Sequence, residues 1–154
     1  MNHRESVDRA GNVEVLRRLA SLEKRAELMF RVSAEDARDA SSRALLNALA
    51  IQYGLFARDL ALLARRVGGP GPERAPIEAD ALRDALEERD PATLMETCES
   101  AERASIDAYR AARRCAWPDF VDAMLERHVR VHAAARFGFL ARSHGFAATA
   151  DDYG

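Results

Sequence analysis

Long apolar segments are absent from this chain of 154 residues. No stretch approaches the roughly 20 consecutive apolar residues that a membrane-spanning helix requires. The N-terminal segment MNHRESVDRAGN also lacks the apolar central region of a secretory signal peptide. We therefore expect no membrane span, and we predict a cytoplasmic location.

Cysteines are also scarce, with only Cys98 and Cys115 in the chain. Both fall on one predicted helix, where a rise of about 1.5 Å per residue separates them by roughly 25 Å. The Cα atoms of a disulfide lie less than about 7 Å apart, so these two residues cannot form one. Both are expected to be free thiols, as is usual in a reducing compartment.

Aromatic residues make up 6% of the chain, whereas apolar residues as a whole make up 48%. The core is therefore expected to consist mainly of leucine, alanine and valine, in a single domain, which suits helices better than sheets. The net charge of −2 gives no electrostatic reason to expect nucleic acid or an anionic membrane as a partner. The sequence also lacks a glycine-rich phosphate loop, a nucleophile elbow and a Cys–His arrangement for covalent catalysis.

Apolar residues recur at intervals of three and four in four segments, which predicts four amphipathic helices. The first is expected to begin after Asn12, and a polar link over Glu35 to Ser42 joins it to the second. The second helix, about Arg43 to Val67, ends at Gly68-Gly69-Pro70, and the third starts after Asp90-Pro91. Such a brief first link implies an antiparallel helical hairpin.

The third helix is expected to run to about Cys115, where the turn Trp117-Pro118 leads into the fourth. The longest connection, Gly68 to Asp90, contains a short amphipathic segment, EADALRDALEERD, which is typical of a crossover along a bundle. The sequence therefore predicts an all-α four-helix bundle in which a long crossover with a short extra helix joins two hairpins. We expect an N-terminal tail over residues 1–11, the bundle over 12–145 and a C-terminal tail over 146–154.

The second predicted helix is apolar on more than one side, because Ile51, Leu55 and Leu62 lie off its main apolar stripe. A helix of this kind has to be covered on two sides. Either the following connection packs over it or a second subunit does, and we predict self-association through this helix, as a dimer.

Polar residues interrupt the apolar stripes near the middle of the predicted bundle. Counted from the two hairpin turns at about 1.5 Å per residue, they reach the same depth within one or two helical turns. Unpaired burial of such groups is costly, so we expect them to have partners. From the first helix to the fourth they are Glu27 with Glu23 nearby, Gln52 facing Glu27, Glu102, His128 and His132.

Several segments resemble the ferritin-like superfamily, and more closely a family of small bacterial four-helix-bundle proteins of unknown function. They are VEVLRRL, AELMFRVSAED, LARRVGGP and LMETCESAERASIDAYRAA, together with a late histidine, His132. The resemblance covers most of residues 13–143 and implies a bundle with inward-facing metal ligands. A ferritin-like di-iron site takes a Glu from each of two helices and a Glu-x-x-His pair from each of the other two.

The chain departs from that ligand set. Gln52 is the expected inward residue of the second helix, and Leu55 stands where a histidine would follow it. In the fourth helix, Val129 lies three residues before His132, so Glu-x-x-His is absent there as well. The remaining carboxylates are too few for two metal ions, which argues against an oxidase or another di-iron enzyme.

Three interpretations of the remaining polar residues stay open, and one of them is a degenerate remnant of a di-metal site in the bundle core. The i, i+4 spacing of His128 and His132 lets two imidazoles bind one divalent metal, zinc or iron, with Glu102 and Glu27 as further ligands. Such a protein would act in stress or metal handling. Alternatively, the same residues form a hydrogen-bonded core network that fixes helix register in a non-catalytic, self-associating bundle. Tyr109, on the apolar stripe of the third helix, is expected to anchor the packing of that helix.

Overall fold

The chain forms four α-helices in a computed structural model that describes the backbone of residues 3–69 and 91–151 and the side chains of residues 9–69 and 93–142. The described residues contain no strand, so the predicted all-α four-helix bundle is confirmed. The extra helix that the sequence predicts in the crossover lies outside the described residues. The helices are α1 (His3–Asp36), α2 (Ala40–Gly68), α4 (Pro91–Ala112) and α5 (Asp119–Asp151).

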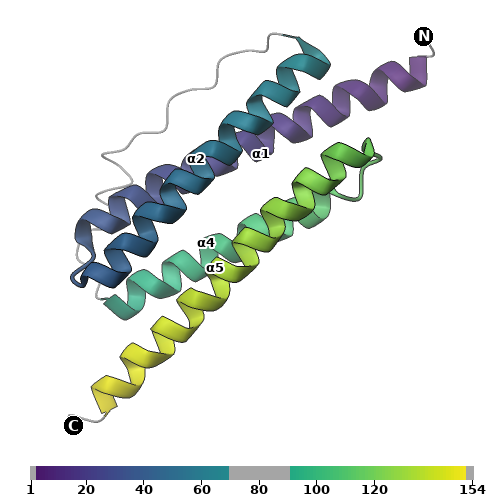
Figure 1. Cartoon of the computed structure of the whole chain (residues 1–154). Helices are drawn as coiled ribbons and strands as arrows, with labels where there is room; N and C mark the ends of the chain where they lie inside the picture. The colour runs from purple at the N-terminus through teal and green to yellow at the C-terminus, as the bar shows by residue number, and fades with distance from the viewer. Residues whose placement is uncertain (1–2, 70–90, 152–154) are drawn as a thin grey trace.

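Two antiparallel hairpins make up the bundle, α1 with α2 and α4 with α5 (Figure 1). The first turn is closed by Asp39, whose carboxylate accepts a hydrogen bond from the Ser42 amide at 2.7 Å and so caps α2. At the other end of α2, Gly69 adopts a positive φ of 74°, which glycine tolerates without strain. In the second hairpin, the Trp117 indole donates to the Ala112 carbonyl at 2.7 Å and satisfies the end of α4.

The outer helices are longer than the sequence predicts. α1 begins at His3 instead of after Asn12, and α5 continues to Asp151 instead of ending near residue 145. The α1 extension contains alanine, arginine and glutamate and the α5 extension contains three alanines, residue types that favour helices, and the interior Gly11 costs only about 1 kcal/mol. A residue that can cap a helix, such as Asn12, therefore does not by itself start one. The helix propensities of the residues around it decide where the helix begins.

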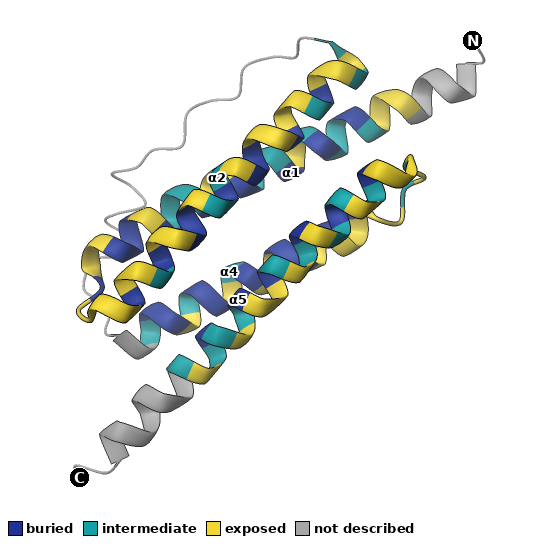
Figure 2. Cartoon of the chain, viewed as in Figure 1, coloured by how far each residue is buried: buried dark blue, intermediate teal, exposed yellow. Residues whose placement is uncertain are grey.

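The core consists of two apolar clusters, one toward each end of the bundle. Phe30, Leu46 and Phe139 belong to the cluster near the α1–α2 turn, and Leu16 and Leu125 belong to the cluster near the α4–α5 turn. Figure 2 shows the buried faces of the two hairpins turned toward one another. Buried polar side chains lie on those same facing surfaces, and they form the candidate site.

The second apolar side of α2 faces outward. Ile51 is 69% exposed, Leu55 50% and Leu62 47%, which confirms that this helix has an apolar surface outside its own core. None of the helices, over the residues described, combines the length and the apolar character needed to cross a bilayer.

Candidate functional site

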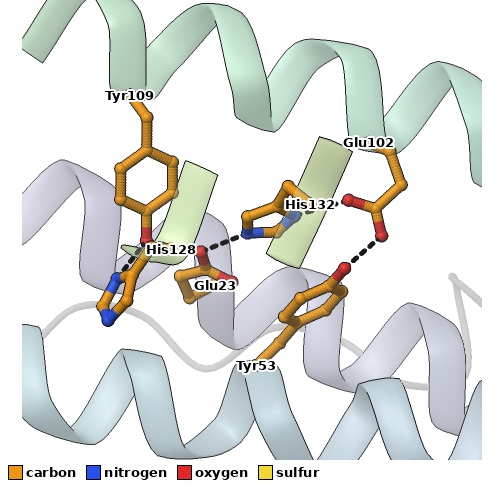
Figure 3. A network of polar contacts seen from close by, with 6 residues as sticks. All are labelled: Glu23, Tyr53, Glu102, Tyr109, His128 and His132. Atoms are coloured by element: carbon orange, nitrogen blue, oxygen red, sulfur yellow. Dashed lines mark hydrogen bonds and ion pairs between the residues drawn. The ribbon is translucent and has the colours of Figure 1, made fainter. Parts of the chain in front are cut away.

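Six polar side chains meet in the middle of the bundle, and all four helices contribute to them (Figure 3). Each of the six is 0% exposed to solvent. They are Glu23 from α1, Tyr53 from α2, Glu102 and Tyr109 from α4, and His128 and His132 from α5. We call this set the core network.

His132 lies at the centre of the core network, between two carboxylates. Its Nδ1 is 2.5 Å from Oε2 of Glu102, and its Nε2 is 2.6 Å from Oε1 of Glu23. A carboxylate accepts hydrogen bonds, so both ring nitrogens carry protons and the ring is an imidazolium. Burial lowers the pKa of His132, but the hydrogen bonds and charges of Glu102 and Glu23 outweigh burial and raise it to about 9.

Two tyrosine hydroxyls also donate hydrogen bonds to these carboxylates. Tyr53 donates to Oε1 of Glu102 at 2.5 Å, and Tyr109 donates to Oε1 of Glu23 at 2.5 Å. Burial, followed by the nearby carboxylates, raises the pKa of both phenols above the ordinary range of tyrosine. Both therefore remain protonated hydrogen-bond donors. The Tyr53 ring also stacks on His132, with ring centroids 4.2 Å apart.

His128 is the end of the chain of hydrogen bonds. Its Nδ1 is 2.9 Å from the Tyr109 hydroxyl, whose only hydrogen is donated to Glu23, so His128 Nδ1 is the donor in this contact. Burial, together with the charges of Arg127 and His132, lowers the pKa of His128 to about 3. The neutral ring consequently carries its proton on Nδ1 and a lone pair on Nε2. It stacks on the Phe56 ring, with ring centroids 3.7 Å apart.

With these protons the core network holds two carboxylates and one imidazolium, so its formal charge is −1. Glu102 and His132 share one proton across their 2.5 Å contact. Burial raises the pKa of Glu102, and the hydrogen bond and charge of His132 oppose that rise. Two acceptor atoms, Oε2 of Glu23 and Nε2 of His128, are buried and find no hydrogen-bond partner in the part of the chain that the structure describes.

Glu27, predicted as the inward carboxylate of the first helix, does not belong to the core network. It lies in the seam between α1 and α2, paired with Lys24 at 2.9 Å, and its carboxyl group approaches Gly54 so closely that a Cβ there would be 2.9 Å from its Cδ. Glu23, one helical turn earlier, occupies the inward position that the sequence predicted for Glu27. Both face the same side of α1, and only the turn nearer the bundle centre reaches α4 and α5.

The inward residues of α2 were also predicted one position away from where they lie. Gln52 is partly exposed and Leu55 is 50% exposed, whereas Tyr53 and Phe56 are buried at 0% and 4%. One residue turns a helix by about 100°, so this shift exchanges a core position for a boundary position. A signal for Tyr53 exists in the sequence, because Leu46, Leu49, Tyr53, Phe56 and Leu60 recur at alternating intervals of three and four residues.

The donor atoms of the core network fit shared protons better than one shared metal ion. Two adjacent ligands with metal bonds of about 2.1 Å stay roughly 3 Å or more apart, which exceeds the 2.5 and 2.6 Å contacts of His132. The two carboxylates also bind opposite nitrogens of the ring. Among the described residues, no three His, Cys, Asp or Glu side chains converge as a ligand set.

No protein-family model matches this chain, and no curated protein matches it.

Proposed function

We propose that this protein is a non-catalytic four-helix bundle of the ferritin-like kind, in which the core network occupies the position of a metal site and the protein acts by association, first with copies of itself. The ferritin-like plan asks for Glu-x-x-His on two helices. At that spacing α2 presents Tyr53-x-x-Phe56, and α5 has Val129 three residues before His132. Two carboxylates and one imidazole of the di-iron set are thus replaced by groups that do not bind iron in that way.

The observation that carries the proposal is how His132 is bonded. Its two nitrogens join Glu102 of its own hairpin to Glu23 of the other hairpin. The bonds of Tyr53 to Glu102 and of Tyr109 to Glu23 also cross between hairpins. A slip of one hairpin along the other would break three bonds and leave buried charges unpaired, which costs several kcal/mol. The core network therefore specifies the register of the two hairpins.

The surface for association is the exposed apolar face of α2, formed by Ile51, Leu55 and Leu62. Contiguous exposed apolar side chains of this size mark interaction surfaces in many soluble proteins. The charged residues of α2 are four arginines and only one acid, Asp59. Two α2 helices therefore repel one another electrostatically, and we expect self-association to strengthen as salt screens that repulsion.

Light scattering of the full chain at low and high salt tests this surface. The proposal predicts a dimer whose fraction increases with salt, and a monomer for Leu55→Glu under all conditions. Ala61→Glu is the matched control, because Ala61 is also exposed on α2 but lies away from the apolar face. A wild-type chain that stays monomeric at millimolar concentration would refute self-association through α2.

A second candidate function, binding of one divalent metal ion such as zinc or iron, is favoured by the charge of the core network. Its formal charge is −1, and Glu23 Oε2 and His128 Nε2 are acceptors without partners in the described structure. If a divalent ion replaced the proton of His132, two carboxylates and two neutral imidazoles would surround it with no net charge. Glu23, Glu102, His128 and His132 would hold it, and His132 would first have to release one carboxylate.

Elemental analysis of protein purified without a histidine tag separates the two candidates. The metal-free proposal predicts less than about a tenth of an equivalent of zinc or iron per chain, because dedicated sites fill far more completely. Near-stoichiometric metal that is lost in Glu102→Gln and retained in the surface variant Glu126→Gln would instead establish the metal site.

A further inference from the structure

A cavity of about 340 Å³ lies at the end of the bundle where the α4–α5 turn meets α1 and the end of α2. Trp117 and Phe120 form one side, Leu16 and Val121 contribute apolar walls, and Arg9 and Asn12 supply the polar groups. Ligand pockets in proteins typically have volumes of about 300 to 1,000 Å³, are mostly apolar and contain a few fixed polar groups. This cavity is separate from the core network and plays no part in the proposed function.

Hydrogen bonds hold the walls of the cavity in place. The Trp117 indole donates to the Ala112 carbonyl at 2.7 Å, so its ring is fixed against the end of α4. The Asn12 side chain donates to the Ala116 carbonyl at 3.1 Å and joins α1 to the α4–α5 turn. Arg9 donates through Nε to the Val67 carbonyl at 3.1 Å. A preformed cavity loses less entropy on binding than one that has to be assembled.

The chemistry of the walls defines a ligand class. Phe120 is 67% exposed, so a flat apolar group seated beside it and Trp117 would remove aromatic surface from water. The Arg9 guanidinium has five N–H donors, and the bond to Val67 uses one of them. No acidic side chain among the described residues forms an ion pair with Arg9.

We propose that this cavity binds a small aromatic carboxylate. Its ring lies against Trp117 and Phe120, and its carboxylate accepts hydrogen bonds from the Nη groups of Arg9. The volume suits a ligand of one ring with a short side chain.

The chain carries its own reporter, because Trp117 is its only tryptophan. Fluorescence of the full-length protein excited at the red edge of indole absorption is titrated with 3-phenylpropionate, its neutral amide and hexanoate. The proposal predicts a saturable change with 3-phenylpropionate at a Kd of about 1 mM or tighter, as expected for a ligand of this size. The amide and hexanoate are each expected to bind at least several-fold more weakly, since each lacks one of the two recognition elements.

Two variants test the assignment of the walls. Arg9→Gln is expected to weaken the binding of 3-phenylpropionate by about tenfold, because a charge-assisted hydrogen bond is lost, and to leave the affinity for the amide unchanged. Phe120→Ala should weaken the binding of both ligands. Arg18 is an exposed arginine on α1 outside this cavity, so Arg18→Gln should weaken the binding of neither. Far-UV circular dichroism confirms that each variant is folded. Absence of a saturable change up to 20 times the expected Kd, that is about 20 mM, or equal affinity for the acid and the amide, would overturn the proposal.

Discussion

Replacing His132 with leucine perturbs the core network most severely. His132 is 0% exposed and bonds Glu23 and Glu102, which are also 0% exposed. His132→Leu removes the only cation of the network and leaves two buried carboxylates unpaired. Removing one partner of a buried ion pair costs about 3 to 5 kcal/mol, a large share of the roughly 5 to 15 kcal/mol that stabilises a typical domain.

The pH dependence of stability separates this loss from a simple packing defect. The pKa of His132 is about 9 in the folded chain, against about 6.5 for an unfolded histidine. The contribution of this pKa shift to the free energy of unfolding is on the order of 3 kcal/mol. It is fully present below pH 6.5 and is lost as the pH rises through 9. In His132→Leu this alkaline loss should disappear, and the deficit relative to wild type should shrink at low pH, where the unpaired carboxylates take up protons.

Urea unfolding followed by circular dichroism between pH 5 and pH 9.5 measures both effects. The triple variant Glu23→Gln, Glu102→Gln, His132→Leu is the control, because it removes both carboxylate charges along with the cation. It should recover about 2 kcal/mol or more relative to His132→Leu at pH 7, since neutral groups are far cheaper to bury than unpaired ions. The electrostatic reasoning would be refuted if the free energy of unfolding of His132→Leu lay within about 1 kcal/mol of wild type. It would also be refuted if the triple variant were no more stable than His132→Leu.

Four further predictions concern other residues of the bundle. His128 has a pKa of about 3 in the folded chain, so unfolding takes up a proton below pH 6.5 and stability falls as the pH drops toward 3; His128→Phe should flatten this acid loss in the same urea assay. Gly54→Ala should stabilise by up to about 1 kcal/mol, because the new methyl group meets only the movable end of Glu27. Gly68→Ala should instead destabilise by about 1 to 3 kcal/mol, because the methyl group would lie 2.7 Å from the stiff, buried side chain of Val13; thermal unfolding of the two variants gives opposite signs. Asp39→Ala should cost about 1 kcal/mol through loss of the α2 cap, measured by the same thermal unfolding.

Periodicity predicted the helices and the level of the polar residues because both follow from spacing along the chain. Helical rise places Glu102, His128 and His132 at similar depth in an antiparallel hairpin; Glu102 and His132 do meet, whereas His128 is bonded to Tyr109. Depth does not distinguish Glu23 from Glu27, since one turn separates them and both face the same seam. Which of the two reaches α4 depends on how closely the hairpins approach, and that distance is set by tertiary packing.

Rotation about a helix axis was harder to predict than position along it. α2 is apolar on two sides, so its sequence permits either Gln52 or Tyr53 as the inward polar residue. Tyr53 follows the main apolar periodicity of α2, but Glu102, which accepts the hydrogen bond of its hydroxyl, lies in the other hairpin. Long-range pairing of this kind leaves no trace in the local sequence of α2, and the same holds for the Tyr109 bond to Glu23.

The central claim is that His132 is a buried imidazolium held between Glu23 and Glu102, and its ¹⁵N resonances test this directly. In histidine-labelled protein at pH 7, both ring nitrogens of His132 should be protonated and should remain so until the pH approaches 9. His128 should be neutral, with its proton on Nδ1. A His132 ring that titrates near pH 6.5, like an exposed histidine, would contradict the claim.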